Sequence, residues 1–152
     1  LWIVLALFLH VIGGVSGFYD NLPGWDHVTH AMSSSLIAAL GFVIVAALDK
    51  YVESIYLPTP FLSLIIVMFT MAMGVSWELM EYVIDEISGS NMQYSLSDTM
   101  VDLLFDLLAG LIVAVCGMYY LRYGSRDRFV DSLQLDEAKD RVVAAVKRSK
   151  EQ

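Results

Sequence analysis

The sequence predicts an all-α integral membrane protein, a bundle of four transmembrane helices followed by a short amphipathic C-terminal helix. The chain has 152 residues, is 57% hydrophobic and has a mean hydropathy of +0.62, whereas soluble domains are roughly 45–50% apolar. A membrane-spanning helix needs about 20 mostly apolar residues, and four segments reach or approach that length. The class is therefore a polytopic membrane protein.

The expected spans are separated by turn-forming sequence rich in Gly, Pro, Asn and Ser. These breaks fall at residues 20–24, 57–60 and 88–91. We expect helices over about residues 1–19, 26–48, 60–87 and 98–123, which together form one transmembrane domain over residues 1–124. In the first helix, Gly13 and Gly17 stand four apart. This spacing suits close packing against a neighbouring helix or subunit, although Gly is also common in membrane helices.

Residues 125–152 form a charged tail that we expect to be cytoplasmic. Glu137 precedes Arg141 by four, a favourable pair on a helix. Apolar residues also recur near helical spacing, at Leu135, Ala138, Val142, Ala145 and Val146. The pattern predicts an amphipathic helix lying on the membrane surface or on a partner subunit, with a solvated, frayed helix as the alternative.

The basic residues predict the orientation in the membrane. All nine lie in the loop after the second span or at and beyond the end of the fourth, namely Lys50, Arg122, Arg126, Arg128, Lys139, Arg141, Lys147, Arg148 and Lys150. With four spans these positions share one side, which the positive-inside rule makes cytoplasmic. We therefore expect a plasma or inner membrane protein with both termini in the cytoplasm. The net charge of −8 argues against nucleic-acid binding.

Acidic residues gather at the opposite side, in and around apolar segments without Lys or Arg. They are Asp20, Asp26, Glu78, Glu81, Asp85, Glu86, Asp98, Asp102 and Asp106. The start of the second span, the end of the third and the start of the fourth would all meet in the outer leaflet. Within each span the acids and His30 recur at intervals of three or four, so each helix presents one polar stripe. Intramembrane ionisable residues are costly and normally functional.

Neighbouring carboxylates cannot all ionise without help, and a divalent cation is one solution. Carboxylate and imidazole groups suit Zn, Mn, Fe, Mg or Ca, and metal sites are built from Glu and His on facing helices of bundles. The candidate ligands are Asp26, His30, Glu78, Glu81, Asp98 and Asp102, with His27, Asp85 and Asp106 as outer-shell groups. Shared protons or a hydrated cavity are the alternative solutions.

Three further features are expected to be structural. Cys116 falls in an apolar run and is expected to be a buried, inert thiol. His10 is expected to be a packed or hydrogen-bonded membrane histidine. The serines at residues 33–35 can hydrogen-bond across helices, and three serines in a helix are only a weak signal for a nucleophile.

Three motifs in order resemble a known family. They are YDNLPGWDHVTH at residues 19–30, WELMEY at 77–82 and SDTMVDLLFDLLAG at 97–110. Together they are similar to the YjdF-like family of small polytopic inner-membrane proteins, which has no assigned function. Its D-x-x-x-H, E-x-x-E and W-D-T-x-x-D motifs fall here on Asp26 and His30, Glu78 and Glu81, and Asp98 and Asp102.

The resemblance covers about residues 19–115 and implies the architecture without supplying an activity. Ser97 stands where the family often has Trp, and His27 is additional. A weaker similarity is to VanZ-like membrane proteins, which also place acids and a His at helix ends.

Two functional classes follow from these observations. The first is a metal-dependent enzyme acting on a membrane lipid or another amphipathic substrate. The second is a non-catalytic accessory or assembly subunit with a structural ion or proton site, bound to other subunits through the tail or the Gly13/Gly17 face. A transporter is less favoured, because the sequence shows no inverted repeat.

Overall fold

All regular secondary structure in the described residues of the computed structural model is helical, which confirms the all-α prediction for this part of the chain. The described residues are 1–51, 58–124 and, in the tail, 129, 131–133, 137, 140, 141, 144, 147 and 148. The helices are α1 (Trp2–Ser16), α2 (Phe18–Asn21), α3 (Trp25–Tyr51), α4 (Thr59–Ser88) and α5 (Leu96–Tyr123).

The amphipathic tail helix cannot be compared with the structure, because all five apolar positions that predict it lie outside the described residues. Those positions are Leu135, Ala138, Val142, Ala145 and Val146. The pair of Glu137 and Arg141 is described, with their charged groups 3.9 Å apart.

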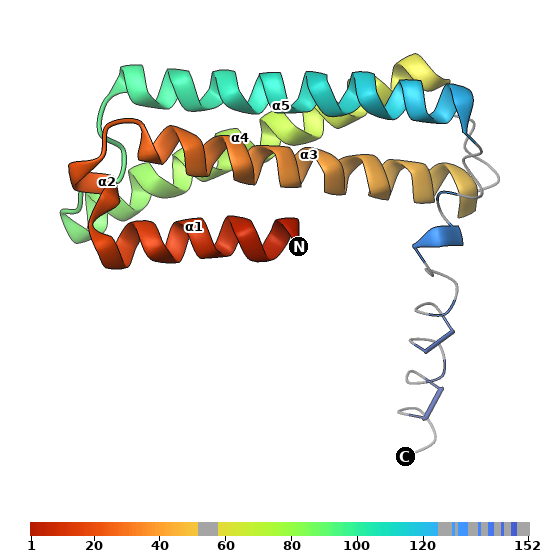
Figure 1. The fold of residues 1–152 in the computed structure, drawn as a ribbon, viewed down its shortest axis with the longest axis horizontal. Helices are drawn as coiled ribbons and strands as arrows, with labels where there is room; N and C mark the ends of the chain where they lie inside the picture. Colours follow the sequence, from red (N-terminus) through yellow and green to blue (C-terminus); the bar gives the residue numbers. More distant parts are fainter. Residues whose placement is uncertain are drawn as a thin grey trace.

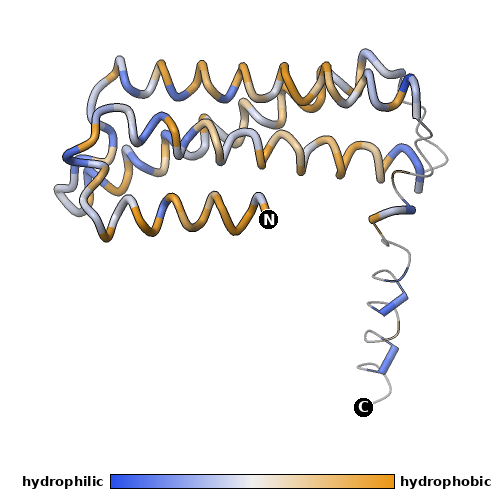
Figure 2. Tube along the Cα trace, viewed as in Figure 1, coloured by the Kyte–Doolittle hydropathy of each residue, from blue (hydrophilic) through white to orange (hydrophobic). Residues whose placement is uncertain are grey.

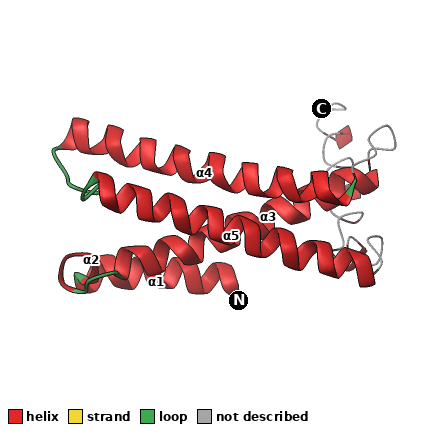
Figure 3. Cartoon of the chain, turned by 90° about the horizontal axis from the view of Figure 1, so that it is seen from above, coloured by secondary structure: helices red, strands yellow, loops and turns green. Residues whose placement is uncertain are grey.

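Helices α3, α4 and α5 form an antiparallel bundle, and α1 packs along α3 (Figures 1 and 3). The start of α3, the end of α4 and the start of α5 lie together at one end, on the left in Figure 1, which we call the acidic end. Hydrophobic residues cover the lengths of the helices, and hydrophilic residues gather toward the two ends of the bundle (Figure 2).

Helices α3, α4 and α5 are long and apolar enough to cross a membrane. They contain 27, 30 and 28 residues, whereas α1 is an apolar helix of 15 residues. The structure therefore supports three of the four predicted spans by length and composition, and the count of four is not confirmed. Large side chains such as Leu104, Ile112 and Val115 are exposed on the outer faces, as lipid-facing residues are.

Small residues line the contacts between the helices and allow close approach. Ala38, Ala46 and Ala114 are buried. Gly117 faces the ring of Phe42, and Gly41 faces the ring of Phe69. The side chains left outside this core include the thiol of Cys116, which is exposed, so the expectation of a buried cysteine was wrong.

The helix ends follow the turn chemistry of the sequence. Gly17 ends α1 and Gly89 ends α4, each in the left-handed conformation with φ of 65° and 69°, which glycine adopts without steric cost. Ser95 precedes α5, and its hydroxyl accepts a hydrogen bond from the backbone N–H of Asp98 at 3.2 Å. This N-cap fixes where α5 begins.

The contact of Gly117 with Phe42 predicts that Gly117→Ala destabilises the bundle. An added Cβ would lie 2.6 Å from a ring carbon of Phe42, and overpacking of this kind costs about 1–3 kcal/mol. Gly14→Ala is the matched control, because nothing lies within 4 Å of a Cβ at Gly14. Thermal unfolding in detergent should show a lower midpoint for Gly117→Ala alone; equal midpoints would contradict the packing.

Candidate metal site at the acidic end

The acidic end brings together side chains from α3, α4 and α5. The first turns of α3 carry Asp26, His27 and His30, the last turns of α4 carry Glu78 and Glu81, and the first turns of α5 carry Asp98, Asp102 and Asp106. Because α4 runs antiparallel to α3 and α5, its last turns meet their first turns.

Asp26, His27, Asp98 and Asp102 form the outer of two groups. Each offers one ligand atom, and these atoms all lie within 4.8 Å of one another. His27 Nδ1 is 3.0 Å from Asp102 Oδ1, and His27 Nε2 is 3.7 Å from Asp98 Oδ1. His27 thus lies among the candidate ligands rather than outside them.

A second, deeper group consists of His30, Glu78 and Asp102, again with ligand atoms within 4.8 Å of one another. Glu78 and Asp102 are only 5% and 2% exposed, and His30 Nδ1 is 3.9 Å from Asp102 Oδ1. Glu78 Oε1 is buried without a hydrogen-bond partner. Asp102 belongs to both groups and therefore joins them.

Asp106 lies one turn deeper and is 2% exposed. Its Oδ1 lies 3.2 Å from His30 Nε2 and 2.5 Å from the hydroxyl of Ser34, while its Oδ2 is buried without a partner. A Cβ at Gly74 would stand 1.8 Å from this Oδ2. The Asp106 carboxylate therefore occupies space that a side chain at residue 74 would fill, and glycine leaves that space open.

Glu81 and Asp85 belong to neither group. Glu81 accepts a hydrogen bond from the indole N–H of Trp77 at 2.8 Å. Asp85 holds the loop that follows α4: its carboxylate accepts hydrogen bonds from the Ser90 hydroxyl at 2.6 Å and from the backbone N–H groups of Met92 and Gln93, each at 2.8 Å. The contacts of Asp85 are thus with the loop.

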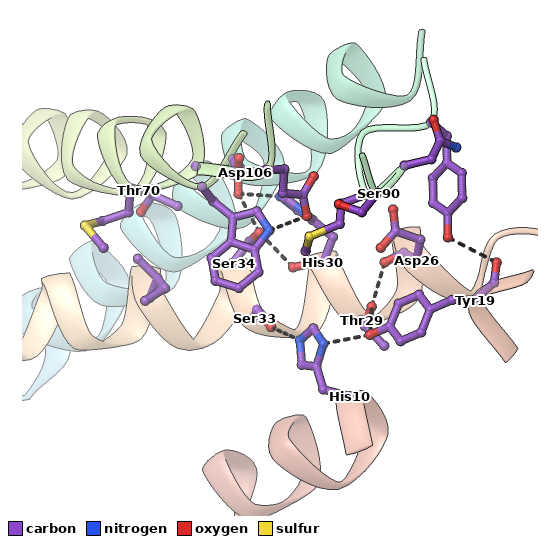
Figure 4. Close-up of a pocket in the computed structure, with 18 residues that line it drawn as sticks. His10, Tyr19, Asp26, Thr29, His30, Ser33, Ser34, Thr70, Ser90 and Asp106 are labelled. Atoms are coloured by element: carbon purple, nitrogen blue, oxygen red, sulfur yellow. Dashed lines mark hydrogen bonds and ion pairs between the residues drawn. The ribbon is translucent and has the colours of Figure 1, made fainter. Parts of the chain in front are cut away.

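A cavity of about 510 Å³ adjoins the site between α1, α3, α4 and the loop before α5 (Figure 4). No Lys or Arg is among the described residues that line it, which are His10, Tyr19, Asp26, Thr29, His30, Ser33, Ser34, Ile37, Thr70, Met73, Gly74, Trp77, Glu81, Ser90, Asn91, Met92, Tyr94 and Asp106.

Sequence reasoning did not assign Tyr19 and Tyr94 to this cavity. Tyr94 donates a hydrogen bond to the carbonyl of Tyr19 at 3.3 Å and so ties the loop to α2. Burial, with Asp26 nearby, raises the pKa of the Tyr94 phenol, which keeps it protonated as a donor. Tyr19 is the first residue of the YDNLPGWDHVTH motif, and its place in that motif could have identified it as a site residue.

The loop contacts of Asp85 predict that Asp85→Asn loosens residues 89–95. The amide has a single acceptor oxygen and no charge, so the two backbone N–H groups and the Ser90 hydroxyl lose part of their shared acceptor. Hydrogen–deuterium exchange at Met92 and Gln93 should accelerate in this variant and stay unchanged in Glu86→Gln, an exposed neighbour. Unchanged exchange in both variants would show that Asp85 does not hold the loop.

Comparisons with known proteins agree with the membrane architecture. Residues 1–123 match the model of the family described as "Predicted membrane protein (DUF2238)". An uncharacterized protein of Thermotoga maritima is 32% identical over 105 residues, 68% of this chain and 53% of that protein, so the chain spans about half the length of this curated relative. No solved structure matches the chain. The family match confirms the resemblance to an uncharacterised membrane family, and the chain belongs to the DUF2238 family of membrane proteins.

Proposed function

We propose that this membrane protein binds one or two divalent cations at its acidic end and uses them in a reaction on an amphipathic substrate. The observation that carries the proposal is Glu78 Oε1, a buried carboxylate oxygen without a hydrogen-bond donor. Glu78 belongs to a group of three residues whose ligand atoms lie within 4.8 Å of one another. A buried carboxylate oxygen without a donor is costly if the group is ionised, and a cation removes that cost.

The spacing of the ligand atoms supports a cation. Ligands about 2.0–2.2 Å from one ion lie about 3–4 Å apart, so the two groups need only a small contraction. Asp102 is common to both groups and suits a carboxylate that bridges two ions. Two-metal sites hold their ions about 3.5–4 Å apart. The mixture of imidazole and carboxylate favours Zn, Mn or Fe over Mg and Ca, which prefer oxygen ligands.

The cavity favours an enzyme over an accessory subunit. A structural ion site needs no access, whereas here a cavity of about 510 Å³ is lined by Asp26, His30 and Asp106. A bound cation can polarise a carbonyl or phosphoryl oxygen of a substrate, and a spare carboxylate can act as general base. An accessory role with a structural ion or proton site remains the competing outcome of the tests below.

The proposed orientation places the cavity in the outer leaflet. Lys50 and Arg122 lie in the last turns of α3 and α5, at the end of the bundle away from the acids. With α1 counted as a fourth span, the positive-inside rule puts that end and both termini in the cytoplasm of a cell bounded by its plasma membrane. The cavity then lies at the depth of lipid head groups.

Metal binding should depend on the deeper group. Purified protein loaded with Mn²⁺ or Zn²⁺ is expected to retain at least one ion per chain, and the Glu78→Gln/Asp102→Asn variant is expected to retain none. At about 100 times the Kd, the cation should stabilise the wild-type fold by about 2.7 kcal/mol, which is seen as a higher unfolding temperature.

Asp20→Asn/Glu86→Gln is the matched control, because it also removes two acids and both are exposed outside the two groups. This control should bind and be stabilised like the wild type. Metal content and unfolding temperature that are the same in all three proteins would reject the cation site.

The orientation has its own test. In a Cys116→Ser background, Ser90→Cys should react in intact cells with a membrane-impermeant maleimide, because the loop after α4 would face outward. Gly124→Cys should react only after the cells are opened. The reverse pattern would invert the topology, and reaction of both in intact cells would contradict an odd number of spans between them.

A further inference from the structure

A hydrogen-bonded chain of side chains crosses from α1 to α3 on the wall of the cavity (Figure 4). His10 Nε2 lies 2.9 Å from the Ser33 hydroxyl oxygen, and His10 Nδ1 lies 2.7 Å from the Tyr19 hydroxyl oxygen. We propose that Ser33 is a nucleophile, that His10 is its general base and that Tyr19 orients His10. The metal groups described above do not include these three residues.

The directions of the hydrogen bonds fix the tautomer of His10. The one hydroxyl proton of Thr29 goes to the carbonyl of Asp26 at 2.9 Å, so Thr29 accepts at its oxygen from the Tyr19 hydroxyl at 3.3 Å. Tyr19 has then given its proton and can only accept from His10 Nδ1–H. His10 Nε2 is left with its lone pair toward Ser33, whose hydroxyl donates to it.

This is the arrangement that activates a hydroxyl: a nucleophile bonded to a base, and the base held by a third group. Ser33, His10 and Tyr19 all line the cavity, so a substrate there can reach the serine. Ser33 also follows His30 by three residues on α3 and therefore lies on the same helix face as a candidate cation ligand.

The chemistry suits a neutral carboxylic ester carried by an amphipathic molecule. The cavity is lined by Asp26, Glu81 and Asp106 and by no described Lys or Arg, an environment that repels an anionic phosphodiester. Polarisation of the ester carbonyl by the cation rests on the proposed function above. The activation of Ser33 by His10 does not rest on it.

In the first step, Ser33 Oγ forms a bond to the ester carbonyl carbon, and its proton moves to His10 Nε2. The carbon–alkoxy bond then breaks, and the alcohol leaves with that proton. In the second step, water attacks the acyl-serine and gives a proton to His10. The acid departs as the bond to Ser33 breaks, and the serine oxygen regains the proton from His10.

A merely structural role is the competing interpretation, because histidine and serine also join membrane helices by hydrogen bonds. Such a role makes the folded state depend on His10 and Ser33 but gives the serine no special reactivity. A covalent probe of serine nucleophiles distinguishes the two.

The experiment treats the full-length protein in detergent with a neutral alkyl fluorophosphonate that carries a fluorescent reporter. Ser33 Oγ displaces fluoride from phosphorus, and its proton passes to His10. Mass spectrometry should locate the adduct on Ser33. Ser33→Ala should abolish labelling, and His10→Gln, which keeps hydrogen-bonding groups, should slow it by about 100-fold or more.

The pH dependence of labelling is a second readout. Wild-type labelling should rise with pH as His10 loses its charge, and this dependence should vanish in His10→Gln.

Ser35→Ala is the matched control, since Ser35 donates to the Met32 carbonyl at 2.8 Å and does not line this cavity. It should label like the wild type. Parallel samples with and without divalent cations separate this proposal from the cation site, because an adduct on Ser33 in either sample supports the relay. The absence of any Ser33 adduct in both samples, or labelling that is unaffected by His10→Gln, overturns the relay and leaves the cation proposal standing.

Discussion

The contacts between buried carboxylates of α5 and histidines of α3 constrain this bundle more than any other interaction in the described residues. Asp102 and Asp106 on α5 are almost fully buried, and the groups that meet them are His27 and His30 on α3. Each pair sets the register and the rotation of α3 against α5. Removing one partner of such a buried pair leaves an uncompensated group, which is strongly destabilising. The acidic end is thus a constraint on the fold and, in our proposal, the site of function.

The polar contacts at the acidic end also require close helix packing, because short polar side chains meet only when the helix backbones approach each other. Gly74 leaves the space that the Asp106 carboxylate fills, and Gly41 and Gly117 each receive a phenylalanine ring. Buried alanines continue this pattern along the bundle. Helix α3 therefore contributes to the cavity on two sides. His30 lies against the acids of α4 and α5, and Ser33 contacts His10 of α1.

The sequence was sufficient for α3, α4 and α5 and for their convergence. It was insufficient for the contacts and for the break at Gly17, which divides the predicted helix over residues 1–19 into α1 and the start of α2. Hydropathy and turn residues placed α3, α4 and α5 within a few residues, and intervals of three and four identified the polar stripes. Local spacing does not encode how far each helix is rotated or how α1 is aligned with α3. The sequence therefore could not show that His27 lies among the ligand atoms, that the Asp106 carboxylate packs against Gly74, or that His10 contacts Ser33. The loop contacts of Asp85 depend on the conformation of residues 89–95.

In our proposal a divalent cation lies between α3, α4 and α5 at Asp102. Anomalous diffraction from crystals of the Mn²⁺-loaded protein tests this position. The expected result is an anomalous peak within about 2.0–2.3 Å of the Asp102 carboxylate and of a nitrogen of His30 or His27. A map without a peak there, or with peaks only at the exposed acids Asp20 and Glu86, would contradict a cation site at Asp102.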